Sequence, residues 1–113
     1  MLHLNTIDDT TLQLLRTLCS KDYMADFALA GGTSLALQTG HRKSIDIDMF
    51  AHREVNMEEI SLFLENEFTD ITIRRTTPVF IFCTINKVKS DFVKHSNHRL
   101  IKPCFTEQEI RMF

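Results

Sequence analysis

Asp46 and Asp48, two carboxylates spaced two residues apart, are the side chains in this sequence with the clearest capacity for chemistry. Residues 44–50 alternate between polar and apolar types, which predicts a strand with one buried face and both carboxylates on the other. At roughly 6 Å and an effective dielectric constant of about 20, two carboxylates repel each other by about 3 kcal/mol. A divalent cation such as Mg²⁺ would offset that cost, although a solvated strand face with two unpaired acids fits the pattern equally well.

A pair of glycines, Gly31-Gly32, follows a short apolar run and precedes helix formers that begin at Thr33. Glycine permits a sharp turn and lets a ligand approach the backbone closely, and a helix N-terminus presents free amides and a positive dipole end. Together with the hydroxyls of Thr33 and Ser34, this turn has the donors of a cradle for nucleotide phosphates. A plain corner between a strand and a helix would have the same sequence.

A third carboxylate, Asp91, lies on a predicted strand from Val88 to Val93. If this strand lies beside the strand of the paired acids, three carboxylates around two metal ions would suit in-line nucleotidyl transfer. One ion would activate the attacking hydroxyl, and the other would steady the triphosphate and the leaving pyrophosphate. The alternative is an ordinary exposed acid.

Basic residues accompany these acids. His41, Arg42 and Lys43 form a turn between the predicted cradle and the acidic strand, where they would either bind nucleotide phosphates or belong to a solvated loop. The second half of the chain carries further cations that would either line a path for RNA or cover a solvated surface: Arg74, Arg75, Lys87, Lys89, Lys94, His95, His98, Arg99 and Lys102.

Helices and strands must alternate along the chain to position these residues. Amphipathic spacing and capping residues predict helices over 7–23, 33–38 and 57–68; Asp8, Asp9 and Thr10 supply capping groups for the first, and Asn56 caps the last. Apolar and alternating runs predict strands over 26–30, 44–50, 71–75, 79–85 and 88–93, with Asn86-Lys87 as a hairpin turn. The tail after Pro103 fits either a helix opened by residues 106–109 or a short strand at 110–113. This order predicts an α/β (α+β) domain, residues 1–113, with helices packed on a mixed sheet.

Composition sets further bounds. With 43% hydrophobic and 25% charged residues the chain reads as one globular domain, and a net charge of −2 gives no reason to expect tight nonspecific binding to nucleic acid. The three cysteines, Cys19, Cys83 and Cys104, form no zinc pattern and are expected as reduced thiols in or near the core. No signal segment or membrane-spanning run is present, so a cytoplasmic protein without a membrane partner is expected. Three phenylalanines are also expected in the core: Phe80, Phe82 and Phe92.

The segment from Phe27 to Phe50 resembles the active-site signature of the AbiEii/AbiGii toxin family, nucleotidyltransferases of the DNA polymerase β-like superfamily. Its two parts are Ala30-Gly31-Gly32 and, after a spacer, Ile45-Asp46-Ile47-Asp48-Met49. Gly40-His41-Arg42 followed by Ser44 is more particular to the toxin family, and Ser90-Asp91-Phe92 matches the place of the third carboxylate. The resemblance covers roughly residues 20–113 and implies a polymerase β-like nucleotidyltransferase core.

The resemblance also implies roles for these residues. Asp46 and Asp48 would bind Mg²⁺ or Mn²⁺, Asp91 would be a metal ligand or general base, and residues 31–34 would hold the triphosphate of an NTP. The implied context is a type IV toxin–antitoxin or phage-defence system, with transfer of a nucleotide to RNA such as tRNA and a cognate antitoxin as partner. Family members usually continue into a helical region that this sequence lacks, which leaves an apolar face that homo-oligomers could bury. Protein AMPylation and a non-catalytic nucleotide-binding or interaction remnant are the alternatives.

Overall fold

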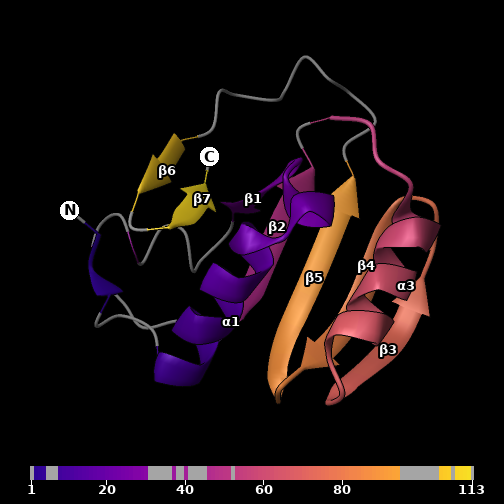
Figure 1. Ribbon diagram of the computed structural model, residues 1–113, viewed down its shortest axis with the longest axis horizontal. Coiled ribbons are helices and arrows are strands. Elements are labelled where there is room, and N and C mark those ends of the chain that lie inside the picture. Colours follow the sequence, from indigo (N-terminus) through magenta and orange to yellow (C-terminus); the bar gives the residue numbers. More distant parts are fainter. Residues whose placement is uncertain are drawn as a thin grey trace.

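The protein is folded around a mixed β-sheet with α-helices on one face, as the computed structural model shows (Figure 1). The helical elements are α1 (Asp9–Ser20), the short 3-10 helix η2 (Asp22–Met24) and α3 (Met57–Glu67). The strands are β1 (Phe27–Ala30), β2 (Ile47–Ala51), β3 (Ile71–Thr76), β4 (Phe80–Ile85), β5 (Val88–Lys94), β6 (Phe105–Glu107) and β7 (Ile110–Met112). The structure describes residues 2–4, 8–30, 37, 40, 46–51, 53–94, 105–107 and 109–112.

The described strands form one seven-stranded sheet in the order β3-β4-β5-β2-β1-β7-β6. The pairs β2–β5 and β1–β7 are parallel, and the other neighbours are antiparallel. Strands that are far apart in sequence therefore become neighbours at the centre of the sheet, where β2 lies between β1 and β5. This is the α/β architecture with a mixed sheet that the sequence predicted.

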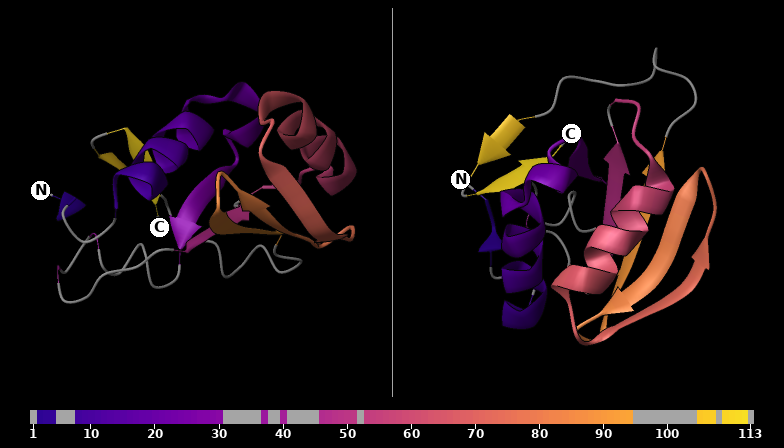
Figure 2. Two further views of the ribbon diagram at one scale, coloured as in Figure 1. Left: turned by 90° about the horizontal axis from the view of Figure 1, so that it is seen from below. Right: turned by 45° about the vertical axis from the view of Figure 1, so that its right-hand side comes forward.

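Both α-helices begin at the capping residues that the sequence indicated. The Asp8 carboxylate accepts a hydrogen bond from the Thr11 amide at 2.7 Å, and the Asn56 side chain accepts one from the Glu59 amide at 3.1 Å. Each bond satisfies an amide that the first turn of a helix leaves free. α1 then lies against β7, and α3 lies against β3 and β4, so that both helices cover the same face of the sheet (Figure 2).

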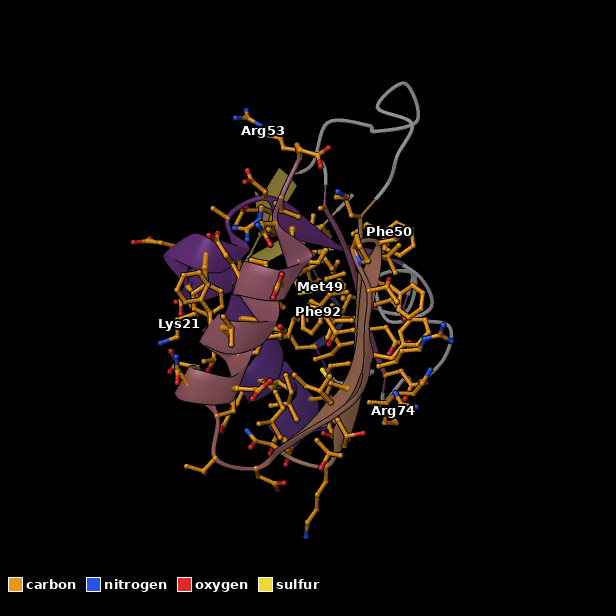
Figure 3. The ribbon with its side chains drawn as sticks, turned by 90° about the vertical axis from the view of Figure 1, so that its right-hand side faces the viewer. Lys21, Met49, Phe50, Arg53, Arg74 and Phe92 are labelled. Carbon is orange, nitrogen blue, oxygen red and sulfur yellow. The ribbon has the colours of Figure 1, made fainter. Side chains whose placement is uncertain are left out.

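The hydrophobic core lies between these helices and the sheet. Met49 of β2 and Phe92 of β5 point toward the helices (Figure 3) and are fully buried. The Phe92 ring meets the Phe27 ring edge to face at 5.8 Å, which joins β5 to β1 through the core. Each such buried side chain contributes roughly 1.5–3 kcal/mol, so this layer fixes which face of β2 and β5 points away from the helices.

Several predicted elements are confirmed within one to three residues at each described end. The predicted helix at 33–38 lies outside the described residues except for Leu37, which is helical and buried. The two alternatives for the tail are now distinguished, because residues 105–112 form the strand pair β6–β7 and no helix begins at Thr106. Phe63 of α3 is 44% exposed, and its ring stacks on that of Tyr23 with centroids 4.9 Å apart.

The described cysteines are free thiols, as expected. Cys83 is buried, and burial is the main cause that raises its pKa to about 12. Burial also raises the pKa of Cys19. Cys104 lies outside the described residues. Within the described part of the chain, no helix has the length and apolar character that crossing a membrane requires.

Candidate active site

One row of residues crosses five neighbouring strands and carries the predicted acids. Asp48 of β2 lies directly opposite Asp91 of β5 on one side and Ala30 of β1 on the other. Asp91 in turn lies opposite Phe82 of β4, which lies opposite Arg75 of β3. Neighbouring strands are about 4.8 Å apart, so the two carboxylates start from adjacent backbone positions. The structure thus brings together two acids that are far apart in the sequence.

The acids lie on the sheet face opposite α1 and α3, which we call the distal face. Ile47, Met49 and Ala51 alternate with them along β2 and are buried beneath the helices. Phe50 and Arg74 project from the distal side of the sheet in Figure 3, opposite Met49 and Phe92. Because side chains alternate along a strand, Asp48 shares this distal face with Phe50, and Asp46 directly precedes the strand. The common face of the two carboxylates stays a prediction, which the effect of the Asp46 charge on the pKa of Asp48 supports.

The charges around Asp48 act against its ionisation. Its pKa is raised, first by burial and then by the negative charge of Asp91, with a further contribution from Asp46. The positive charge of Lys89 acts in the opposite direction and lowers it. A carboxyl group with a raised pKa beside two other acids is an arrangement typical of functional sites.

Asp91 is held by two cations. The Lys89 ammonium lies 3.2 Å from its Oδ2 atom, and the Arg74 guanidinium lies 3.6 Å from its Oδ1 atom. Only 14% of the Asp91 side chain is exposed, and its buried Oδ1 atom has no hydrogen-bond partner among the described residues, because the Arg74 contact exceeds hydrogen-bond length. A buried carboxylate oxygen in this state has unused capacity to accept a donor or bind a cation.

Arg74 reaches Asp91 because β3 contains a β-bulge. The pairing of β3 with β4 shifts between Ile73 and Arg75, so that Arg74 is an extra residue in the ladder. Arg75 contacts the ring of Phe80, with its guanidinium carbon 5.6 Å from the ring centroid. The bulge thereby lets the side chains of both arginines contact residues of the distal face, whereas strict alternation would have placed them on opposite faces of the sheet.

The acids of the distal face differ from a preformed metal site made of protein ligands alone. No three His, Cys, Asp or Glu side chains among the described residues are grouped to hold a metal ion. Asp46 and Asp48 supply the one or two carboxylates that Mg²⁺ takes from a protein when phosphate oxygens and water complete its shell. The unpaired Oδ1 atom of Asp91 lies on the neighbouring strand. The carboxylate oxygens of Asp46 and Asp48, with Asp91 nearby, are therefore ligands of the type that Mg²⁺ or Mn²⁺ binds.

The predicted phosphate-binding residues cannot be placed in the same way. Residues 31–34 and 41–43 lie outside the described residues, and their roles stay predictions. Ala30, which precedes the glycine pair, is the cross-strand partner of Asp48. The chain therefore enters the predicted cradle beside the acidic pair.

Two features of this site were not predicted from the sequence. Lys89 and Arg74 had been considered only as part of an RNA path or solvated surface, and both contact Asp91. The spacing of Lys89 and Asp91 on one strand could have indicated their contact, because residues two apart share a face. The contact of Arg74 depends on the bulge, for which the sequence has no clear signal.

A groove in the described part of the chain lies away from these acids. The start of α3 and the turn between β3 and β4 bound this groove. Lys94, at the end of β5, also lines it and pairs with Glu54 at 2.6 Å. Lys94 lies opposite Ala51, three positions along the strand from the pairing of Asp48 with Asp91, which is a distance of about 10 Å. None of the predicted catalytic or phosphate-binding residues is among the described residues that line this groove, and Lys94 is a candidate only for the RNA path.

The fold is that of a nucleotidyltransferase. A crystal structure from H. pylori, of a protein assigned as a nucleotidyltransferase, superposes with a TM-score of 0.54 at 16% sequence identity. The match covers 96% of this chain and 52% of the H. pylori chain, so this chain spans about half the length of that protein.

The sequence defines the family more narrowly. The family described as the nucleotidyl transferase AbiEii toxin of type IV toxin–antitoxin systems matches residues 13–103. The chain therefore belongs to the AbiEii family. The matched range includes Asp46, Asp48 and Asp91. No curated protein sequence matches the chain significantly.

Proposed function

We propose that the protein is a metal-dependent nucleotidyltransferase that acts as the toxin of a type IV toxin–antitoxin or phage-defence system. In this function it transfers a nucleoside monophosphate from an NTP to an acceptor, which we take to be RNA such as tRNA. The observation that carries the proposal is the direct pairing of Asp48 with Asp91 beside Ala30. Membership of the AbiEii family supports the same reaction and a cognate antitoxin as partner.

The proposed reaction forms one bond and breaks one. The oxygen of an acceptor hydroxyl attacks the α-phosphorus of the NTP, and the bond from that phosphorus to the bridging oxygen of the pyrophosphate breaks. Bound Mg²⁺ or Mn²⁺ would polarise the phosphate oxygens and stabilise the charge that develops on them. Asp46 and Asp48 are the residues that would hold the metal; Asp48 lies on the distal face with Phe50, and the charge of Asp46 contributes to the raised pKa of Asp48.

Asp91 is assigned to the attacking side of the reaction, as a further metal ligand or as the base that takes the hydroxyl proton. Among the described residues its Oδ1 atom accepts no hydrogen bond and has only the longer ion-pair contact with Arg74, so this oxygen keeps capacity to accept a proton or a cation. Lys89 and Arg74 would restrain the Asp91 carboxylate. The proposed role of Gly31, Gly32, Thr33 and Ser34 is to hold the triphosphate, with His41, Arg42 and Lys43 as additional phosphate contacts.

Labelled NTPs provide the direct test. The full chain is incubated with each labelled NTP, Mg²⁺ and total tRNA, and label is followed into RNA and into protein. We expect label on RNA with the wild type and none with the Asp46→Asn/Asp48→Asn variant. The matched control is Glu58→Gln/Glu65→Gln, which removes two exposed acids from α3 and should keep the activity. Equal labelling by the wild type and the Asp variant would show that these acids are not catalytic.

Ligand stabilisation separates binding from chemistry. Mg²⁺ together with an NTP should raise the melting temperature of the wild type, because a ligand that binds only the folded state stabilises it. The Asp46→Asn/Asp48→Asn variant should lose this shift, and the Glu58→Gln/Glu65→Gln control should retain it. An equal shift in all three proteins would place the nucleotide site elsewhere.

A further inference from the structure

Two phenylalanines expected in the core lie instead on the distal face. Phe80 and Phe82 alternate along β4 with Ile81 and Cys83, which are the residues buried beneath the helices. The rings of Phe80 and Phe82 stack on each other with centroids 4.1 Å apart and planes inclined by 19°. Both side chains are only partly buried, and neither belongs to the hydrophobic core. The expectation that they are core residues is therefore wrong, while the same expectation for Phe92 is confirmed.

This aromatic pair is adjacent to the acids. Phe82 lies directly opposite Asp91, which lies directly opposite Asp48. With about 4.8 Å between strands, Phe82 starts roughly 10 Å from Asp48, which is comparable to the reach of a single nucleotide. A base that stacks on this pair would therefore place its sugar within reach of the carboxylates.

The sheet order assigns the aromatic pair to one side of the reaction, given the proposed function. The glycine turn follows β1, which flanks β2 on one side, and β4 lies beyond β5 on the other side. In-line transfer needs the attacking hydroxyl and the leaving pyrophosphate on opposite sides of the α-phosphorus. If the triphosphate lies at the β1 side, the acceptor must approach from the side of β5 and β4.

The charges of the distal face complement a nucleic-acid strand. The Arg75 guanidinium lies over the Phe80 ring at 5.6 Å, and Arg74 and Lys89 lie beside Asp91 on the same face. Aromatic rings that stack on bases, together with cations that meet phosphates, are the combination by which proteins bind single strands without reading sequence.

We propose that Phe80, Phe82 and Arg75 form the binding site for the unpaired end of an RNA acceptor. A terminal base extends the stack of the two rings on the Phe82 side, and Arg75, which lies over the Phe80 ring, contacts a backbone phosphate. This inference rests on the proposed function, since it uses the position of the triphosphate to define the acceptor side. It makes Phe80, Phe82 and Arg75 positioning residues for the acceptor, without a part in the chemical step.

The test measures the affinity of a fluorescent ten-nucleotide single-stranded RNA by anisotropy. Phe82→Leu should weaken binding about five- to a hundredfold, and Phe80→Leu/Phe82→Leu should weaken it further, because leucine keeps the apolar contact but has no π face. Arg75→Gln should lower the slope of log affinity against log salt by about 0.7, the value for one phosphate contact with a single strand. An RNA of the same length without bases should bind the wild type and both Phe variants equally.

Matched controls guard against a general loss of structure. Phe63→Leu removes one ring from the Tyr23–Phe63 stack, which joins α3 to η2, and should leave RNA affinity unchanged. Arg53→Gln removes an exposed arginine, which Figure 3 shows at the opposite end of the molecule from Arg74, and should keep the salt slope. Circular dichroism of every variant checks that the fold persists.

The outcomes distinguish this inference from the proposed function. Loss of RNA affinity in Phe80→Leu/Phe82→Leu, with its stabilisation by Mg²⁺–NTP retained, supports the acceptor site. Unchanged RNA affinity in a folded variant overturns the acceptor site, whatever the transfer assay shows. Loss of the Mg²⁺–NTP stabilisation overturns it as well, because the phenylalanines would then hold the base of the NTP. The proposed function is decided separately, by the Asp46→Asn/Asp48→Asn variant.

Discussion

Asp48 shows how one residue depends on partners from several strands. Burial and the charges of Asp91 and Asp46 raise its pKa, and Lys89 of β5 opposes them. The folded protein therefore binds the proton of Asp48 more tightly than the unfolded chain, whose reference pKa is 3.8. The stability that this group contributes is fully present below the unfolded pKa and is lost as the pH rises through the raised folded pKa. At neutral pH the ionised carboxylate is thus a local source of instability.

Asp48→Asn should relieve this instability. We expect the variant to be more stable than the wild type at pH 7 by up to about 1 kcal/mol, allowing for screening by solvent. The difference should shrink as the pH falls through the raised pKa of Asp48 toward 3.8. Urea unfolding between pH 4 and 7.5 in the presence of EDTA measures both quantities.

A second variant checks the assigned cause. Because Lys89 lowers the pKa of Asp48, the gain from Asp48→Asn should be larger in a Lys89→Met background. A difference that does not vary with pH, or a gain unaffected by Lys89, would contradict the electrostatic explanation.

Elements that are defined by local sequence signals could be predicted, and those that depend on distant pairing could not. The caps at Asp8 and Asn56 and the turn at Asn86-Lys87 are all confirmed, because each depends on a few neighbouring residues. The strand pair β6–β7 could not be distinguished from a helix, since its formation depends on pairing with β1 at Leu29 and Met112. Tertiary contacts of this kind override local preference.

The same distinction between local signals and distant pairing applies to the residues of the candidate site. The placement of Asp48 on the face away from Ile47, Met49 and Ala51 follows from strand periodicity alone, so the sequence was sufficient to predict it. The pairing of Asp48 with Asp91 needed the parallel register of β2 and β5, which no local pattern encodes. Phe80 and Phe82 were expected in the core because aromatic residues usually lie there, and the sequence does not show which face of β4 is covered by helices.

The β4–β5 hairpin offers a test at the level of elements. Asn86 and Lys87 have positive φ angles of 51° and 68°, the conformation of a type I′ turn, in which glycine is preferred at the second position. Lys87→Gly should remove the strain of a left-handed lysine, and the greater flexibility of glycine in the unfolded chain should offset part of the gain. We expect a net stabilisation of about 0.5 kcal/mol by urea unfolding. Thr72→Gly, at an exposed position of β3, should destabilise instead; a loss of stability in both variants would contradict the turn assignment.

At the scale of the whole molecule, Arg111 joins the last strand to the first half of the chain. Its Nε atom donates to the Phe27 carbonyl, and its Nη2 atom donates to the Met24 carbonyl. These bonds connect β7 to β1 and to η2, on the side of the sheet farthest from β3. The extents of 35 × 34 × 21 Å are those of a thin two-layer molecule, in which such lateral ties hold the edge of the sheet in place.

Arg111→Lys should destabilise the protein by about 1–3 kcal/mol, because a lysine ammonium is a point charge that cannot match both directions of the guanidinium. Thermal and urea unfolding measure the change. Arg16→Lys is the control, since the Arg16–Glu109 pair is exposed on the Glu109 side and should contribute under about 1 kcal/mol. Equal effects of the two substitutions would show that the carbonyl contacts of Arg111 are not important for stability.

The bulge in β3 has a consequence for how such a site can change over generations. Ile73 pairs with Cys83, and Arg75 pairs with Phe82, so the residues on both sides of Arg74 are already in register with consecutive positions of β4. Loss of the single codon for Arg74 would leave a continuous ladder with every other pairing unchanged. The guanidinium beside Asp91 can thus be gained or discarded by one in-frame insertion or deletion, independently of the rest of the sheet.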